Sequence, residues 1–107
     1  MNRFMGIGKL TRNAIQSGTE NKAITFTVVT EIGYDENLKR ERTAYVPCVF
    51  FNPPEEIRKQ LVEEGVDLEV DFEGTVNRSS YKKDGVTKFN TEVIIDPENF
   101  NILTEED

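Results

Sequence analysis

Residues 67–95 contain the pattern that most constrains how this chain can fold. Between Leu68 and Phe72 apolar residues alternate with acidic ones, and Gly74 ends the alternation. Successive side chains of a strand point to opposite faces, so a period of two predicts a strand with one buried face. Asp84-Gly85 then predicts a tight turn, because both residues tolerate a positive φ. The stretch therefore predicts two antiparallel strands joined as a long hairpin.

This predicted hairpin carries cations beside aromatic rings. A groove for single-stranded nucleic acid needs both, because rings stack on bases while cations contact phosphates. The alternative is a solvated hairpin tip with ordinary cross-strand pairs. The cations are Arg78, Lys82, Lys83 and Lys88, and the rings are Tyr81 and Phe89.

The overall charge argues against a general nucleic-acid binder, whose usual footprint is a basic domain. The net charge is −7, but it is unevenly distributed. Residues 75–90 hold four cations against one acid, whereas residues 55–74 hold two against eight and residues 91–107 none against six. A cleft responds to its local field, so a basic hairpin can still attract an anion. We expect modest affinity.

The composition excludes several kinds of site. Cys48 is the only cysteine and histidine is absent, which leaves neither a disulfide framework nor the residues for a zinc site or a catalytic Cys-His pair. We therefore expect no metal and no cofactor. The sequence shows no signal peptide and no apolar run long enough to span a membrane. These features predict a soluble cytoplasmic protein.

The first half of the chain predicts three more strands. Residues 3–12 form the first, interrupted by Gly6 and Gly8, and residues 13–21 form a loop. Residues 22–32 alternate cleanly and are rich in β-branched residues, which predicts the second strand. Residues 33–41 are polar and predict a hairpin loop. Residues 42–51 predict the third strand, in which Pro47 favours an edge position or a bulge.

A short helix is predicted after this third strand. Asn52 can cap it, Glu55 can complete a capping box, and Gly65 ends it. Ile57 and Leu61, with neighbouring Val62, form its apolar stripe. After the long hairpin, residues 99–103 predict a last short strand, and residues 104–107 are expected to fray.

One helix between the third and fourth of five strands is the layout of an OB-fold. This is an all-β, partly open Greek-key barrel of five strands. No linker or repeat interrupts the chain, so residues 1–107 are expected to form a single domain.

These segments, in this order, resemble bacterial single-stranded DNA-binding proteins over nearly the whole chain. Residues 2–10 resemble the family's Asn-Lys-x-x-x-x-Gly-x-Leu start, and residues 41–51 are similar to its third strand. Residues 65–74 resemble its Gly-x-x-Val-x-Val-x-Gly run. Lys83-Asp84-Gly85 and the Thr-Glu-Val of residues 91–93 are similar to its turn and last strand. Three alternatives are open within this resemblance: a family member from which the C-terminal tail was removed, a relative similar to the tailless primosomal replication protein N, or a divergent paralogue.

The resemblance implies a protein that binds single-stranded DNA without sequence specificity, in DNA replication, recombination or repair, and that is associated with the nucleoid. It also implies a homo-oligomer. Its stacking positions fall on Tyr34, Tyr45, Phe51 and Tyr81, and its phosphate contacts among Lys9, Arg12, Arg42, Arg78, Lys82, Lys83 and Lys88.

Two other functions are open to this sequence. One is a primosome-type protein-interaction module with weak nucleic-acid binding, in which acidic faces and sheet edges dock replication proteins. The other is an enzyme, since Asp67, Glu69, Asp71 and Glu73 alternate along one strand. A row of acids on an outward face more often gives solubility or protects an edge, so we expect no enzymatic activity.

A first strand with apolar Phe4, Met5 and Ile7 predicts self-association. An unprotected edge strand is a template for pairing with another chain. We expect a homodimer or a homotetramer.

Overall fold

The computed structural model describes residues 2–16 and 23–103, so residues 17–21 of the predicted loop and the end expected to fray at residues 104–107 lie outside it. No helix in the described ranges is long and apolar enough to cross a membrane. The described elements are β1 (Phe4–Leu10), β2 (Ile15–Gln16), β3 (Ala23–Asp35), β4 (Arg40–Phe51), α1 (Glu55–Glu64), β5 (Glu69–Lys83) and β6 (Val86–Leu103).

Five of these strands close into a barrel. The sheet order is β1-β5-β6-β4-β3-β2, and β1 also pairs with β3, which joins the two sides. All the pairings are antiparallel except β4 with β6, which run parallel at Cys48 and Val49. The predicted OB-fold, with its helix between the third and fourth barrel strands, is confirmed. The two-residue β2 is an addition, because it lies in the predicted loop of residues 13–21.

The core fills the barrel with the residues that the alternation placed inside. Phe50 contacts Phe100 edge-on with ring centroids 5.0 Å apart, and Phe26 contacts it similarly at 6.0 Å. Helix α1 adds Leu61, which is fully buried, and the predicted partners Ile57 and Val62 pack partly buried against the same cluster. The core holds no buried polar residue in the described ranges.

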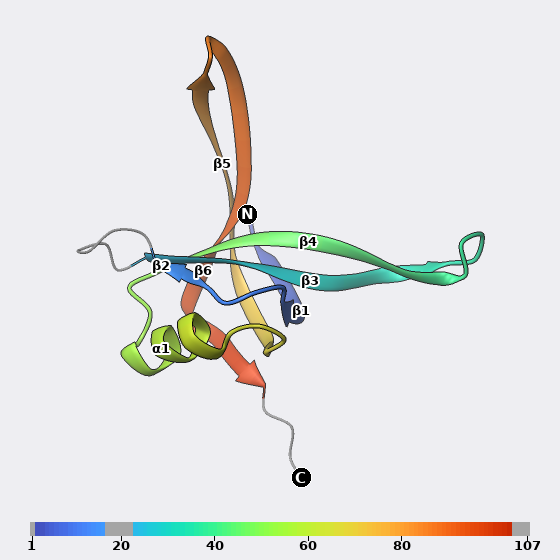
Figure 1. The fold of residues 1–107 in the computed structure, drawn as a ribbon, viewed down its shortest axis with the longest axis horizontal. Helices are drawn as coiled ribbons and strands as arrows, with labels where there is room; N and C mark the ends of the chain where they lie inside the picture. The colour runs from blue at the N-terminus through green and yellow to red at the C-terminus, as the bar shows by residue number, and fades with distance from the viewer. Residues whose placement is uncertain (1, 17–22, 104–107) are drawn as a thin grey trace.

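Two long hairpins leave the barrel in different directions (Figure 1). One of them is the β3–β4 arm (residues 31–43). The prediction of a loop at residues 33–41 is wrong, because β3 continues to Asp35 and β4 begins at Arg40. Gly33 has φ 143° beside a register shift that follows Glu31, and this irregularity lets the ladder continue. Asp35 accepts the backbone N–H groups of Asn37 and Leu38, and so closes the tip.

The β5–β6 arm (residues 75–94) is the hairpin predicted around Asp84-Gly85. These two residues have φ 53° and 78°, as a two-residue turn with positive φ requires. Strand β6 then bends at residues 96–99 and pairs again with β5 through Phe100. The predicted last strand at residues 99–103 is therefore a continuation of β6.

The start of α1 differs from the prediction. Pro54 is the N-cap residue and no side chain caps the helix, while Asn52 has φ 51° and lies two residues earlier. Glu55 pairs with Arg58 instead of completing a capping box. Gly65 does end the helix, but at φ −69°. Close packing requires a glycine at this position, because a Cβ on residue 65 would lie 2.2 Å from the Leu61 carbonyl oxygen.

Gly8 should be similarly intolerant of a side chain. A Cβ there would lie 2.1 Å from the Val29 carbonyl oxygen, at the seam where β1 meets β3. We expect Gly8→Ala to lower the free energy of unfolding by about 1–3 kcal/mol, the usual cost of overpacking. Urea denaturation followed by circular dichroism measures this, with Thr43→Ala on the exposed β3–β4 arm as the control. Equal midpoints for the two variants would contradict the prediction.

Candidate nucleic-acid interface

Strand β4 presents its aromatic side chains outward. Cys48 and Phe50 point into the core, so the alternate residues on this strand point away from it. Tyr45 is 68% exposed and Phe51 is 51% exposed. The register with β3 is unbroken from Thr43 to Phe51, so both rings lie on the same outer face of the sheet.

This outer face continues from the barrel onto the β5–β6 arm. Val49 on β4 lies beside Ile94 on β6 in the parallel pairing, so these two side chains share the outer face. Counting by two along β6 leads to Lys88, whose cross-strand partner is Tyr81 on β5. Tyr81 is 50% exposed. The structure thus places three of the four predicted stacking rings on one continuous face.

The side chain of Tyr34, the fourth predicted ring, is not described. Its backbone pairs with Glu41 in the β3–β4 arm, so the residue lies on a strand rather than in a loop. Its proposed stacking role stays a prediction.

Predicted cations lie beside this face at several points. Arg12 lines a groove with Pro47 and Asn90, between the barrel and the base of the β5–β6 arm. Arg42 and its neighbour Arg40 line another groove together with Tyr45. Lys9 is one strand removed from Tyr45, across Val29, but Glu69 lies directly opposite it on β5. An acid directly opposite partly offsets the charge of Lys9, and its predicted phosphate contact stays a prediction.

The four arm cations divide between two faces. Lys83 and Lys88 lie on the face of Tyr81, whereas Arg78 and Lys82 alternate onto the opposite face. Arg78 lies over the ring of Phe89, 4.0 Å from its centroid. Arg78 and Lys82 thus lie on the arm face opposite Tyr81, and the phosphate contacts of all four cations stay predictions. Arg40 is a neighbour that the prediction did not include, and Phe89 was predicted as a ring of the hairpin but not as one of the four stacking positions.

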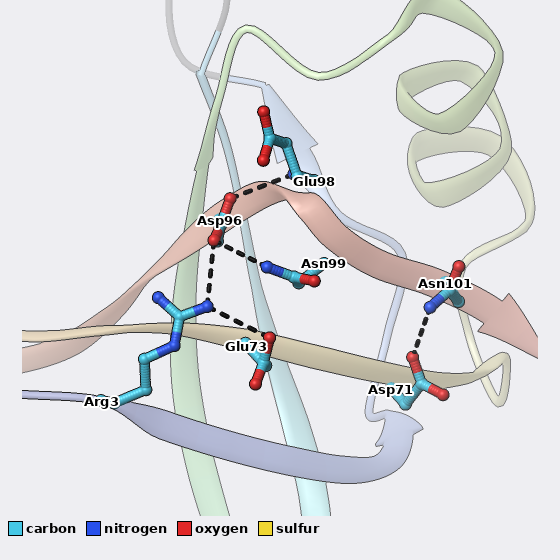
Figure 2. A network of polar contacts seen from close by, with 7 residues as sticks. All are labelled: Arg3, Asp71, Glu73, Asp96, Glu98, Asn99 and Asn101. Carbon is cyan, nitrogen blue, oxygen red and sulfur yellow. Dashed lines mark hydrogen bonds and ion pairs between the residues drawn. The ribbon is translucent and has the colours of Figure 1, made fainter.

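The N-terminal residues hold the base of the β5–β6 arm. The Asn2 amide donates to the Val76 carbonyl at 2.6 Å and accepts from the Val76 N–H at 3.0 Å, as a further strand would. The Arg3 guanidinium bridges Glu73 on β5 and Asp96 on β6, both at 3.1 Å (Figure 2). Asp96 also accepts hydrogen bonds from the Glu98 N–H and the Asn99 amide. We call Arg3, Glu73 and Asp96 the basal clamp.

Two acids of the row on β5, Asp71 and Glu73, make structural contacts. Glu73 belongs to the basal clamp, and Asp71 accepts a hydrogen bond of 2.8 Å from Asn101 (Figure 2). The described residues include no group of three His, Cys, Asp or Glu side chains that could hold a metal ion. Burial raises the pKa of the Cys48 thiol to about 12, which keeps it protonated and unreactive.

Comparison with known proteins agrees with this geometry. A model of the "Single-strand binding protein family" matches residues 1–103. The chain belongs to this family. A "Single-stranded DNA-binding protein" of Staphylococcus epidermidis is 28% identical over 114 residues, covering 100% of this chain and 86% of the relative.

The fold of this family member is also found in a solved structure. The structure described as "Plasmodium falciparum SSB complex with ssDNA" superposes with a TM-score of 0.73 at 18% identity. The match covers 98% of this chain and 96% of the other. At this identity the likeness shows a shared fold.

The basal clamp should make stability depend on pH. Hydrogen bonds from Asn99, the Glu98 N–H and Arg3 hold the pKa of Asp96 below its ordinary value of 3.8. A carboxyl whose pKa is lowered by folding stabilises the folded state above its ordinary pKa, and this stabilisation is lost as the pH falls through the folded-state value. We expect Asp96→Asn to lower the urea midpoint at pH 7, and the deficit to shrink below about pH 3.8.

Glu98→Gln is the matched control, because it removes the same charge while Glu98 contributes only its backbone N–H. Urea midpoints of both variants and the wild type, measured from pH 7 to pH 3, test the assignment. The same pH profile for both variants would refute a specific role for Asp96.

Proposed function

We propose that this chain binds single-stranded DNA without sequence preference, in the cytoplasm, during DNA replication, recombination or repair. The observation that carries this is the continuous outer face on which Tyr45, Phe51 and Tyr81 are all half exposed or more. Rings left in solvent can stack on bases of any identity, because every base has a π-face. The relatives named for single-stranded DNA support the same ligand.

Phosphate contacts come from the cations around this face. Lys83 and Lys88 lie on the face of Tyr81, Arg42 lines a groove with Tyr45, and Arg12 lines a groove with Pro47. The described residues give none of these four cations an ion-pair partner. Nearby acids already have partners within the fold. Arg3 pairs with Glu73 on β5 and with Asp96 in the bend of β6, and Asn101 donates a hydrogen bond to Asp71. The local field at the outer face is thus more positive than the net charge of −7 suggests.

Stacking should be measurable ring by ring. We expect Tyr45→Ala and Tyr81→Ala each to weaken binding of oligo-dT by about 1–3 kcal/mol, the usual value of one stacked base. Tyr45→Phe should bind nearly as well as the wild type, because it keeps the ring. Fluorescence anisotropy of a labelled oligonucleotide measures all three, with Val66→Ala, an exposed apolar change beyond α1, as the control.

The same titration at several salt concentrations tests the phosphate contacts. The logarithm of the binding constant should fall with a slope of about −0.7 per neutralised phosphate. Absence of binding even at low salt would reject the proposed function.

We propose further that the chain forms a homodimer or a homotetramer through β1. In the described residues β1 pairs with β3 only at Lys9 and Leu10, which leaves its earlier residues unpaired on that side. Met5 and Ile7 are 72% and 57% exposed there, beside an apolar groove that Ala44 and Val46 also line. An unpaired edge with exposed apolar side chains favours pairing with a second copy.

Replacing Ile7 with a charged residue should disrupt this assembly. We expect the wild type to sediment as a dimer or tetramer at micromolar concentration and Ile7→Glu to shift towards the monomer, because a carboxylate would be buried in the interface. Val86→Glu, at the exposed tip of the β5–β6 arm, is the control. A wild type that sediments only as a monomer would refute the proposed assembly.

A further inference from the structure

A groove opens in the outer face where β6 leaves β4. The parallel pairing of these strands joins residues 48–49 to residues 93–94, so β4 and β6 separate towards Pro47 and Glu92. The groove between them has a volume of about 300 Å³, at the lower end of the range for ligand pockets. It is therefore large enough for one nucleotide base but not for a run of bases.

Two oppositely charged side chains, Arg12 and Glu92, line this groove. Arg12 lies beside β3, because the N–H of the preceding Thr11 donates to the Thr27 carbonyl. Glu92 is two residues from Ile94 on β6 and shares its outer face. Strands β3 and β4 lie between the two residues, so their backbones are roughly 10–15 Å apart at the usual strand spacing. A base can thus lie between the guanidinium and the carboxylate.

Glu92 is the acid of this face that the fold does not use. It is partly buried, yet the described residues give it neither an ion-pair partner nor a hydrogen-bond donor. By contrast, Asp71, Glu73 and Asp96 all have partners. Removing a carboxylate from water without a partner costs free energy, which a ligand with hydrogen-bond donors would recover. A carboxylate repels phosphate, so the atoms that a DNA strand presents to Glu92 belong to a base.

A carboxylate distinguishes the bases by their hydrogen-bond donors. When ionised, it can only accept hydrogen bonds. Guanine has two adjacent donors on its Watson–Crick edge, the N1–H and the N2 amine, and single-stranded bases leave this edge free. Adenine and cytosine have one donor beside an acceptor there, and thymine has one donor between two acceptors. Guanine is therefore the base that can donate two parallel hydrogen bonds to one carboxylate.

The other side of the groove suits the same base. Arginine binds the O6 and N7 atoms of guanine with two hydrogen bonds, the commonest base-specific contact of proteins with DNA. Arg12 and Glu92 can therefore hold two different edges of one guanine. Pro47 and Ile15, which is 58% exposed, offer apolar surface in the groove to the face of the base.

From this we infer that the groove is a guanine site within the DNA path. Glu92 accepts hydrogen bonds from the N1–H and the N2 amine, and Arg12 donates to O6 and N7. The inference rests on the proposed function, because the guanine belongs to a strand bound along the outer face. Stacking on Tyr45, Phe51 and Tyr81 stays indifferent to base identity, so the preference concerns one position of the strand. A merely solvated Glu92 would give no such preference.

Single-base changes in a short probe test this site. The probes are oligo-dT of about 10 nucleotides, within the range of one OB-fold, with thymine, guanine, adenine or cytosine at the central position. We expect the guanine probe to bind about tenfold more tightly than the other three, a difference typical of a bidentate base contact. Hypoxanthine lacks the N2 amine and 7-deazaguanine lacks N7, so both should bind more weakly than guanine in fluorescence anisotropy titrations.

Three variants assign the preference to residues. Glu92→Gln should lose most of the guanine preference and bind oligo-dT at least as tightly as the wild type, because a negative charge has left the path. Arg12→Ala should abolish the difference between guanine and 7-deazaguanine. Glu98→Gln removes the same charge as Glu92→Gln, but in the bend of β6, and should keep the full preference.

The other outcomes separate this site from the proposed function. If the wild type binds all the probes equally well, the guanine site does not exist, although the proposed function stands. A guanine preference that survives in Glu92→Gln would also overturn the inference, because another part of the chain would then recognise the base. So would weaker binding of oligo-dT by Glu92→Gln together with a lower urea midpoint, because Glu92 would then be a structural residue. If the wild type binds no probe, the proposed function fails and the guanine site fails with it.

Discussion

The aromatic contacts inside the barrel determine which residues remain outside it. Phe26 and Phe50 both meet Phe100, and these three rings fix the inward phase of β3, β4 and β6. Because side chains alternate along a strand, fixing the inward residues also fixes the outward ones. Tyr45 is exposed for this reason: a slip of one residue would exchange it with Val46. The candidate interface is in this sense a consequence of core packing.

Phe100 can pack against Phe26 and Phe50 in the core only because β6 bends. Gly74 pairs with Ile95 and Phe72 pairs with Phe100, so residues 96–99 form a bulge opposite Glu73. Asp96 holds the bulge by accepting the Glu98 N–H and the Asn99 amide, and Arg3 joins it to β5. One strand can thus serve both the exposed arm and the barrel.

The strands and the outward rings were predictable from the sequence because both follow a period of two. The alternation from Leu68 to Phe72 and the Asp84-Gly85 turn appear as expected. The loop at residues 33–41 was mispredicted, because polar composition hides a ladder that continues past the irregularity at Gly33. The prediction that Asn52 caps α1 was wrong for a related reason, since the φ of 51° at Asn52 cannot be inferred from residue type. Turn chemistry and bulges depend on local backbone geometry more than on composition.

The division of the arm into two faces could have been derived from the turn. A two-residue turn at Asp84-Gly85 makes Lys83 face Val86, and counting outward places Ser80 opposite Phe89 and Arg78 opposite Thr91. Proximity in sequence does not reveal this division, because Arg78 and Tyr81 are only three residues apart yet lie on opposite faces of β5. The contact between Arg78 and Phe89 itself required coordinates, since a diagonal pair forms only when twist and rotamers bring it together.

The distribution of charge reconciles an acidic chain with an anionic ligand. Acids at the base of the arm are used within the fold: Glu73 and Asp96 hold Arg3, and Asp71 holds Asn101. Beyond that base the arm bears four cations against Asp84 and Glu92. A strand of DNA meets this local field within a Debye length of about 8 Å at physiological salt, so the more distant acids are largely screened. Acids at the base of the arm therefore stabilise the fold through the basal clamp, whereas the cations of the arm beyond it remain available to a ligand.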